Sequence, residues 1–477
     1  MAADKPLVLD VDGTFLRTDL ALESVWAGLG HAPRETIAAL LATLGRPAAF
    51  RRAVTRIAPP RVDLLPLRAE IAEAALASRE QGREVVLVSQ ADAALVEALA
   101  GHYGFTGGIG SDGRSDLAGE GRAAVLKSAF GLRGYDYAGD SGRDRAAWMA
   151  ADRAVVVGGR PGLLAELQAA GRRVEVVPGG WRWRDLVQAL RPHQWVKNIL
   201  LFLPVLAAHD FTLPTLLLVL LGMVAFSAAA SCIYVVNDLL DLEADRLHPT
   251  KRNRPFAAGA VPIAVGMAAS LGLGLLALGI GAALGWAFLG VLALYMALSL
   301  AYSLRLKRLR WVDIATLAAL YTIRVVAGAA ATGGGASVLM LVFVFPVFLS
   351  LGCVKRMTEL ALAESNDRLP GRGYGRGDRG DLLNVAWIGV VGALVVFFAY
   401  SFTEQAHALY PTRWLLWLTL VPLAVWLIRM VVLGYRGKQD YDPIVFALRD
   451  RVGLGLIFFA LSFMFYSAGL WQRWFGF

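Results

Sequence analysis

The stretch Asn237-Asp238-Leu239-Leu240-Asp241-Leu242-Glu243-Ala244-Asp245 directly follows a long apolar run at residues 213–236. Positions i, i+3 and i+7 share one face of a helix, so Asp238, Asp241 and Asp245 project together, with Asn237 beside them. Oxygen ligands gathered at the edge of a membrane suit Mg²⁺ bridged to a diphosphate. Burying such a cluster without a cation would be costly. The alternative is a solvated helix end.

Three cations follow this stretch in a turn-rich loop, Lys251, Arg252 and Arg254. Their side chains would meet the phosphate oxygens that a metal ion leaves uncovered. The two motifs together predict a site for an anionic substrate that carries phosphate groups.

The apolar residues of this 477-residue chain are unevenly distributed. Residues 1–190 have the composition of a soluble domain, whereas residues 195–477 are apolar runs separated by charged loops, which is typical of a polytopic membrane protein. Cys232 and Cys353 lie far apart within apolar runs, so no disulfide or metal pair is expected. We predict nine spans, of which the first is short, at residues 196–208, 213–236, 261–282, 285–303, 312–331, 337–354, 384–402, 413–433 and 453–472.

Basic residues crowd alternate loops between these spans. The opposite loops hold few, with Arg413 and Arg473 as the clear cases. The crowded loops contain Arg246, Lys251, Arg252, Arg254, Arg305, Lys307, Arg308, Arg310, Lys355, Arg356, Arg368, Arg372, Arg376, Arg379, Arg436, Lys438, Arg449 and Arg451. We predict a multi-pass protein of a bacterial plasma membrane. The positive-inside rule then predicts that its N-terminal domain and active sites are in the cytoplasm and its C-terminus outside. The formal charge of +9 needs no nucleic acid to explain it.

The membrane half resembles the UbiA superfamily of intramembrane prenyltransferases over about 280 residues. The resemblance rests on the Asn237–Asp245 motif and the span count. Where typical members carry a second aspartate-rich motif, this chain has Lys355-Arg356 and Glu359. Lys355 and Glu359 are spaced to form a plain surface pair, which is the alternative to a role in binding.

This departure resembles one branch, the decaprenyl-phosphate phosphoribosyltransferases. The matching segments are Arg191-Pro192-His193-Gln194-Trp195-Val196-Lys197-Asn198, Tyr302-Ser303 with Leu306-Lys307 and Asp313, Lys355-Arg356, and Asp442-Pro443. The resemblance implies 5-phosphoribosyl diphosphate as donor, polyprenyl phosphate as acceptor and the lipid bilayer as surroundings. Mg²⁺ held by Asn237, Asp238, Asp241 and Asp245 would stabilise the departing diphosphate.

Two anionic substrates must meet in this reaction, so more cations than carboxylates are needed. Arg324 is notable because an arginine within a span is costly and is usually paired or functional. The substrate-binding candidates are Lys197, Asn198, Lys251, Arg254, Tyr302, Lys307, Arg324, Lys355 and Arg356. A prenyltransferase with a polyprenyl diphosphate donor and an aromatic acceptor would use the same aspartates and is the alternative.

The N-terminal part begins with an apolar strand, Leu7–Leu9, that runs into Asp10-Val11-Asp12-Gly13-Thr14. Asp10 and Asp12 alternate along the strand end and point the same way, and Gly13 permits a sharp turn. Further apolar strands are predicted at 85–88, before Ser89, at 155–157 and at 174–177, with a short one before Gly139-Asp140. Strands that alternate with helices predict an open parallel α/β sheet with its site at the strand ends.

This ordered set resembles the haloacid dehalogenase-like phosphatases over residues 5–178. The resemblance implies that Asp10 is the nucleophile, that Asp12 is the acid and base, and that Ser89 and Lys127 hold the phosphoryl group. Asp10 and Asp140 would bind a second Mg²⁺, with Asp144 supporting that metal site or orienting Lys127. Residues 19–80 are predicted to form a small helical cap. A catalytically inactive docking or regulatory module is the alternative.

We therefore predict three parts. They are a haloacid dehalogenase-like domain at 1–178 with a Rossmann-like parallel sheet, an amphipathic interfacial linker at 179–194 and an all-helical UbiA-like membrane domain at 195–477. The linker would hold the soluble site near the membrane, although a plain linker is almost as consistent. The fused enzyme would make decaprenyl-phosphoryl 5-phosphoribose and then remove its 5-phosphate, giving decaprenyl-phosphoryl ribose, a precursor of cell-wall arabinan. The oligomeric state stays open, a homo-oligomer included.

Overall fold

The computed structural model describes residues 5–112, 117–159, 161–362, 373–439 and 442–476. The chain forms two compact units, residues 1–190 with 234–270 and residues 191–233 with 271–477. The aspartate-rich stretch therefore groups with the N-terminal α/β part. The predicted domain boundaries at residues 178 and 194 stay predictions.

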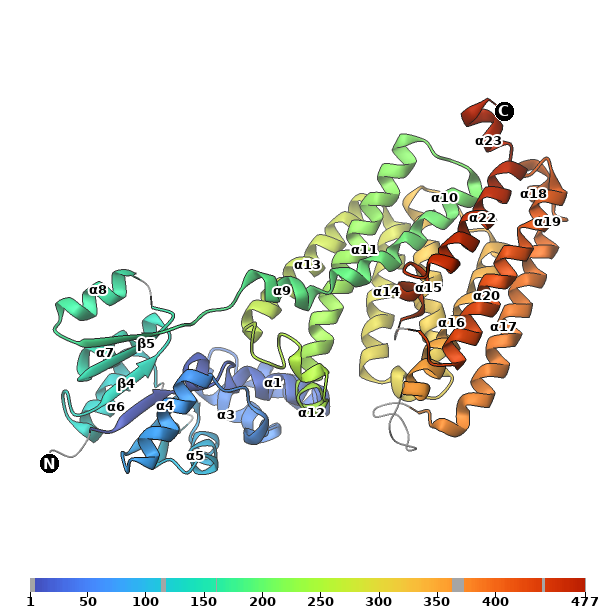
Figure 1. The fold of residues 1–477 in the computed structure, drawn as a ribbon. Helices are drawn as coiled ribbons and strands as arrows, with labels where there is room; N and C mark the ends of the chain where they lie inside the picture. The colour runs from blue at the N-terminus through green and yellow to red at the C-terminus, as the bar shows by residue number, and fades with distance from the viewer. Residues whose placement is uncertain (1–4, 113–116, 160, 363–372, 440–441, 477) are drawn as a thin grey trace. The chain divides into compact units, whose positions relative to one another are not determined.

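A parallel sheet forms the centre of the first unit (Figure 1). It has six strands in the order β3-β2-β1-β4-β5-β6. Its strands are β1 (Leu7–Asp10), β2 (Val85–Asp92), β3 (Gly107–Ser111), β4 (Asp136–Gly139), β5 (Arg153–Val157) and β6 (Arg173–Val177). The chain order reverses between β1 and β4, which lie side by side, and ligands of such sheets bind at the carboxyl ends of the strands at this point. The predicted parallel α/β sheet is confirmed.

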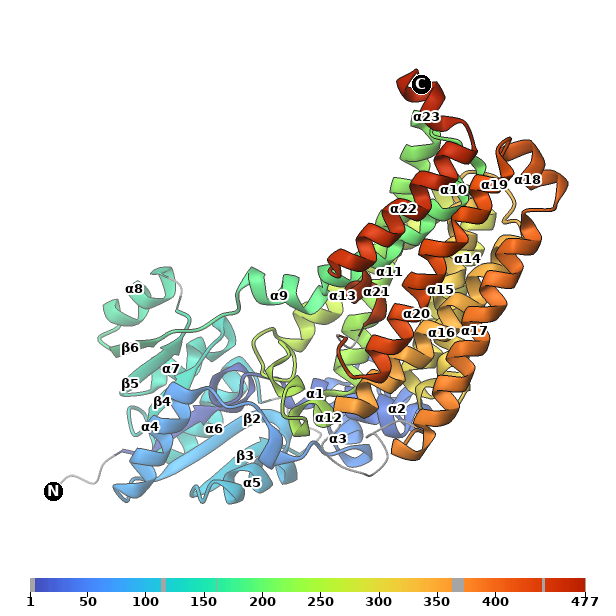
Figure 2. The same ribbon diagram turned by 45° about the vertical axis from the view of Figure 1, so that its right-hand side comes forward.

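Helices cover both faces of this sheet, as the mainly apolar strands require (Figure 2). On one face, α4 (Ala69–Glu80) and α5 (Ala93–His102) bury Ile71 and Leu99. On the other, α6 (Gly119–Phe130), α7 (Arg145–Ala150) and α8 (Pro161–Ala169) bury Leu126, Trp148 and Leu167.

Three helices are inserted after β1: α1 (Leu20–His31), α2 (Pro33–Ala42) and α3 (Pro47–Ile57). Leu16, before the insertion, and Leu67, after it, pair in an isolated antiparallel bridge. The predicted cap at 19–80 was therefore too long. Helix α4 packs against the sheet instead, because Ile71, Ala72 and Ala75 gather on one of its faces and are buried there.

The linker contains the short helix α9 (Trp183–Leu190), which is amphipathic as predicted. Trp183 is 69% exposed, whereas Leu186 and Ala189 are buried beside Leu239 and Phe256 within the same unit. Its proposed place at a membrane surface stays a prediction.

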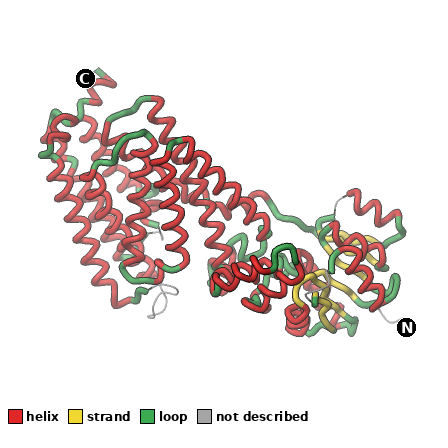
Figure 3. Tube along the Cα trace, turned by 180° about the vertical axis from the view of Figure 1, so that it is seen from behind, coloured by secondary structure: helices red, strands yellow, loops and turns green. Residues whose placement is uncertain are grey.

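The second unit is helical, and Figure 3 shows strands in the N-terminal part of the chain and helices in the remainder. A 3₁₀ stretch, Pro192–Phe202, leads into α10 (Leu203–Ala208). The following helices are α11 (Leu213–Leu240), α12 (Leu242–Leu247), α13 (Ile263–Ala283), α14 (Trp286–Leu304), α15 (Val312–Ala331), α16 (Val338–Leu362), α17 (Arg379–Tyr400), α18 (Glu404–Leu409), α19 (Arg413–Leu418), α20 (Leu420–Tyr435), α21 (Pro443–Ala447), α22 (Arg451–Ser467) and α23 (Leu470–Phe475). Helices α11 and α13 each pass from one unit to the other, and α12 belongs to the first.

Within the described residues, 7 helical segments are long and apolar enough to cross a membrane. They are Leu213–Leu240, Ile263–Ala283, Trp286–Leu304, Val312–Ala331, Val338–Leu362, Arg376–Tyr400 and Arg413–Tyr435. The nine predicted spans are not confirmed. The first coincides with the 3₁₀ stretch and the six-residue α10, and the last with the 17-residue α22.

Small residues let the helices of the second unit approach closely. A Cβ on Gly328 of α15 would lie 2.0 Å from the Leu201 carbonyl oxygen, and one on Gly389 of α17 would lie 2.8 Å from that of Pro346 in α16. The apolar core lies among α15, α16, α17 and α20. The 3₁₀ stretch, which carries Lys197 and Asn198, is thereby fixed against α15.

Candidate functional site

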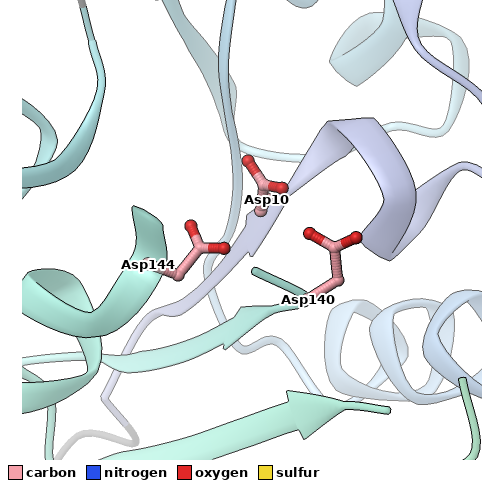
Figure 4. Close-up of side chains that lie close together, drawn as sticks. All are labelled: Asp10, Asp140 and Asp144. Atoms are coloured by element: carbon pink, nitrogen blue, oxygen red, sulfur yellow. The ribbon is translucent and has the colours of Figure 1, made fainter. Parts of the chain in front are cut away.

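Three carboxylates meet at the carboxyl ends of β1 and β4. Asp10 ends β1, Asp140 follows β4, and Asp144 lies at the start of α7. One oxygen of each lies within 4.8 Å of the others, and Figure 4 shows the three groups around one space. Asp10 and Asp144 are buried and Asp140 is exposed. Hard oxygen ligands at this spacing fit Mg²⁺, so the carboxylates predicted to bind metal in this domain do come together.

Asp12 is held by two hydrogen bonds at the edge of this group. Its Oδ1 accepts from the Leu20 backbone N–H (2.8 Å) and its Oδ2 from the Ser89 hydroxyl (2.6 Å). Burial, helped by the charge of Asp19, raises the pKa of Asp12 to about 7, although both hydrogen bonds oppose the rise. A pKa near neutrality suits a group that gives and takes protons. Ser89, predicted to hold the phosphoryl group, orients Asp12 in this structure.

The cation beside Asp10 is Arg122, and the prediction of Lys127 for this place was wrong. Arg122 Nη1 lies 2.6 Å from an oxygen of Asp10 and 2.6 Å from one of Asp144, and it donates to the Tyr137 hydroxyl (2.7 Å). Lys127 is exposed on the same helix, α6. Five residues rotate an α-helix by about 140° beyond a full turn, so the two side chains face different directions. Burial raises the pKa of Asp10, and Arg122 opposes that rise.

A cavity of about 260 Å³ opens over these groups. The cap contributes to its wall through Asp19 and Ala21 at the start of α1 and through Arg51 of α3. Although Asp140 keeps an exposed side, the surrounding protein removes part of its solvation, and this, with the charge of Asp144, raises its pKa to about 6. The remaining wall residues are Asp10, Asp12, Gln90, Ala91, Arg122, Asp140, Ser141 and Arg143. Carboxylates and arginines thus line the same cavity, a combination whose chemistry suits a metal ion together with an anionic ligand.

The aspartate-rich stretch runs from the end of α11 through α12. The helix breaks at Asp241, but the Asp245 N–H still donates to the Asp241 carbonyl (2.8 Å), which keeps the helical spacing. Asp238 and Asp245 are 2% and 3% exposed. Arg254 Nη1 lies 3.2 Å from Asp238 Oδ1 and 2.7 Å from Asp245 Oδ2. Two of the three predicted carboxylates therefore converge on one cation.

The third carboxylate of the stretch is Asp241. Asp241 is half-buried, and within the described residues this trio does not meet the 4.8 Å spacing found at the ends of β1 and β4. Asp238 and Asp245 share one cation, Arg254. The same two carboxylates would suit Mg²⁺ if Arg254 moved to the phosphate oxygens of a ligand. Asn237 is half-buried and Lys251 is exposed. Burial raises the pKa of Asp245, while Arg254 opposes the rise.

In the second unit, two lysines act on one carboxylate. Lys197 and Asp442 form a buried ion pair, and Asp442 also caps α21 by accepting from the Ile444 N–H (3.2 Å). Burial alone would raise the pKa of Asp442, but Lys197 and Lys355 bring it below its ordinary value. Two cations and one carboxylate leave net positive charge at this place, which suits an anionic ligand.

Arg324 is 4% exposed in α15. It donates to the Asn198 side-chain oxygen (3.0 Å), the Tyr295 hydroxyl (3.1 Å) and the Leu320 carbonyl (2.6 Å). All its hydrogen-bond partners among the described residues are neutral, so its charge is oriented without being neutralised. Asn198 is fixed in turn by donating to the Ser227 hydroxyl (2.9 Å).

Arg356, predicted to bind substrate, is instead fully buried. Its Nε lies 2.5 Å from Asp313, its Nη2 donates to the Tyr302 hydroxyl (3.0 Å), and it pairs with Glu359. Tyr302, another binding candidate, donates to Asp313 (2.9 Å) within the same network. Because these contacts occupy the hydrogen-bond donors of Arg356, its side chain forms a buried ion pair within the protein rather than facing a ligand. Lys307 is half-buried on a 3₁₀ turn.

An apolar cavity of about 320 Å³ lies elsewhere in the second unit. Leu203 and Ala207 of α10, Phe343 of α16, Leu423 of α20 and Ile457 of α22 contribute to its wall. Its size and lining suit part of a hydrocarbon chain.

A family model described as the UbiA prenyltransferase family matches residues 199–361. The chain is also 34% identical, over 277 residues, to the decaprenyl-phosphate phosphoribosyltransferase of Mycobacterium tuberculosis, a match that covers 56% of this chain and 88% of that protein. The chain belongs to the UbiA prenyltransferase family. The six-stranded sheet of this UbiA-family protein lies outside the residues that the family model matches.

A second relative extends over nearly the whole UbiA-family chain. The uncharacterized protein y4nM of Sinorhizobium fredii is 35% identical over 463 residues, covering 94% of this chain and 88% of that protein. Among solved structures, a UbiA homolog from Archaeoglobus fulgidus bound to GPP and Mg²⁺ aligns with a TM-score of 0.46 and 13% identity, covering 59% of this chain and 99% of that one.

Proposed function

We propose that this protein transfers 5-phosphoribose from 5-phosphoribosyl diphosphate to a polyprenyl phosphate and then removes the 5-phosphate. The observation that carries the first step is the 34% identity to the mycobacterial phosphoribosyltransferase. The cations of the second unit support it, because Lys197, Lys355 and Arg324 together carry more positive charge than Asp442 neutralises. An anionic acceptor needs such an excess, whereas a neutral aromatic acceptor does not.

In the transfer step, an oxygen of the acceptor phosphate forms a bond to the anomeric carbon of ribose, and the bond from that carbon to diphosphate breaks. Asp238 and Asp245 would hold Mg²⁺, which stabilises the charge of the departing diphosphate when bound. Arg254 and Lys251 would neutralise further phosphate oxygens. The hydrocarbon tail of the acceptor would lie in the bilayer or in the apolar cavity between α10 and α22.

In the second step, a carboxylate oxygen of Asp10 would attack phosphorus, and the bond from phosphorus to the ribose 5-oxygen breaks. Asp12 would give its proton to that oxygen and later take one from the water that hydrolyses the aspartyl-phosphate. Arg122 would hold Asp10 in place, and Asp140 and Asp144 would complete a Mg²⁺ site. Fusion of the two sites in one chain would raise the effective concentration of the intermediate.

Product analysis with labelled 5-phosphoribosyl diphosphate and decaprenyl phosphate tests both steps. The purified chain should release diphosphate and inorganic phosphate and leave a lipid-linked ribose. Asp10→Asn should leave the lipid with its 5-phosphate, and Asp238→Asn should stop diphosphate release. Phosphate release that survives in Asp10→Asn would remove the phosphatase assignment. Transfer of a prenyl group to an aromatic compound, with no need for 5-phosphoribosyl diphosphate, would replace the first step.

A further inference from the structure

Helix α1 has the phosphatase cavity at its first turn. The Leu20 N–H donates to Asp12 Oδ1 (2.8 Å), and Asp19, the residue that caps the helix, contributes to the cavity wall. A small displacement of this turn would move the hydrogen bond that holds Asp12. The start of α1 is thus part of the support of the proposed acid and base.

One turn further on, α1 carries a carboxylate that is buried against the aspartate-rich segment. Glu23 Oε1 lies 2.6 Å from Arg246 Nη2, and Glu23 Oε2 lies 3.0 Å from Arg246 Nη1. The two side chains are 4% and 7% exposed, and the Thr18 hydroxyl donates to Glu23 as well (2.6 Å). Paired hydrogen bonds of this kind fix direction as well as distance, and breaking a buried pair leaves a charge uncompensated.

Arg246 in turn belongs to the segment that carries the proposed diphosphate ligands. It directly follows Asp245, and its Nε donates to the Ala257 carbonyl (3.0 Å) in the loop that contains Arg254. Arg254 spans Asp238 and Asp245. A ligand that draws Arg254 away from these carboxylates acts on the residue next to Arg246.

Close packing surrounds this ion pair. Trp26 of α1 is buried with Leu239, Leu242 and Phe256 of the segment. Gly259 has a φ of +65° and approaches so closely that a Cβ there would lie 2.6 Å from that of Arg17. Closely packed side chains move together, so a displacement of the aspartate-rich segment is transmitted to α1.

We propose that α1 couples the two proposed sites through the Glu23–Arg246 pair, so that a diphosphate held at Asp238 and Asp245 increases the rate of phosphate-ester hydrolysis at Asp10. The inference rests on the proposed function for the location of both sites. Its physical basis is one helix that supports Asp12 at its first turn and holds the aspartate-rich segment one turn later. Hydrolysis would then be fastest when the transferase site is engaged.

Hydrolysis of p-nitrophenyl phosphate by the full-length purified chain tests the coupling. The rate is measured at a fixed concentration of free Mg²⁺, with and without inorganic diphosphate. We expect diphosphate to raise kcat by about fivefold, a factor comparable to the weaker effects that one ligand has on the affinity of another. Glu23→Gln and Arg246→Gln should each abolish this increase, and the charge-swapped double variant Glu23→Arg with Arg246→Glu should restore it.

Two further variants make the outcomes decisive. The increase should vanish in Asp238→Asn, which alters the proposed diphosphate site. It should persist in Glu243→Gln, the matched control. This variant removes an exposed ion pair with Arg61 (3.9 Å, with Arg61 49% and Glu243 45% exposed), which also joins the insertion after β1 to the aspartate-rich segment. No increase in the wild type, or an increase that survives in Asp238→Asn or in both single variants of the pair, would overturn the proposal. Loss of the proposed phosphatase itself is a separate result, shown by hydrolysis that continues in Asp10→Asn.

Discussion

At the scale of the residue, the two α/β carboxylates Asp10 and Asp140 could be placed from sequence and the cation beside them could not. Each carboxylate ends or follows a strand, and neighbouring parallel strands end at one edge of the sheet. It is harder to predict which face of α6 packs against the sheet. Only small or apolar residues lie between Arg122 and Lys127, so the sequence does not show which of these two side chains points into the site. Only the packing of Leu126 against the sheet shows which side chain enters the site.

Replacing Arg122 should therefore impair the proposed phosphatase activity far more than replacing Lys127. Arg122→Ala removes the charge that both Asp10 and Asp144 contact, and we expect kcat for p-nitrophenyl phosphate to fall by about a hundredfold or more. Lys127→Ala, an exposed position on the same helix, should change it less than about twofold. Circular dichroism would establish that both variants fold. Equal losses in the two variants would show that Arg122 is not the cation of this site.

Arg356 leads to a prediction about stability rather than binding. Arg356→Met leaves Asp313 buried without its cation, and we expect the variant to lose about 3–5 kcal/mol of unfolding free energy. Arg310 pairs with Asp378 and Asp381 but is 37% exposed, so Arg310→Met should cost less than about 1 kcal/mol. Thermal unfolding in detergent compares the two. A variant of Arg356 that unfolds like the wild type would make this residue a binding candidate again.

At the scale of the element, most strands were predicted from apolar runs, but β3 was not. Its sequence, Gly107-Gly108-Ile109-Gly110-Ser111, has weak strand propensity. The strand forms because its glycines let α5 approach: a Cβ on Gly110 would lie 2.4 Å from the Ala93 Cα. Propensity was thus overridden by packing that only the fold shows. The first and last predicted spans were not confirmed, because the helices found there are too short. Apolar composition alone does not determine how long a helix is.

Gly110→Ala should destabilise the first unit by more than about 1 kcal/mol, because α5 must shift to admit the methyl group. Gly101, near the end of α5, offers a matched control, since a Cβ placed there would meet no atom of the described residues within 4 Å. Gly101→Ala should therefore be neutral or stabilise by up to about 1 kcal/mol, as alanine favours the helix. Urea unfolding of both variants gives the comparison, and equal midpoints would contradict the packing argument.

At the scale of the whole molecule, composition predicted a soluble and an apolar part. The parallel sheet and the 7 candidate spans among the described residues agree with that division. The grouping of residues 234–270 with the N-terminal unit was not foreseen. It depends on contacts between segments that are more than two hundred residues apart in the sequence, such as Glu23 with Arg246. Local sequence patterns do not predict such contacts.

The predicted orientation is open to a labelling experiment. With Cys232 and Cys353 replaced by alanine, a cysteine at exposed Arg413 should react with a membrane-impermeant maleimide in intact spheroplasts. A cysteine at exposed Lys438, at the other end of the helical segment Arg413–Tyr435, should react only after the membrane is permeabilised. The reverse pattern would place the basic loops outside and contradict a cytoplasmic active site.

The bridge between Leu16 and Leu67 has a consequence for how such chains diversify. The insertion leaves the sheet domain and returns to it where Leu16 pairs with Leu67. Its length and sequence can therefore change without altering how the strands of the sheet pair. Relatives with a longer, shorter or missing insertion would keep the carboxylates at the ends of β1 and β4 and, under the proposed function, would accept esters of different bulk.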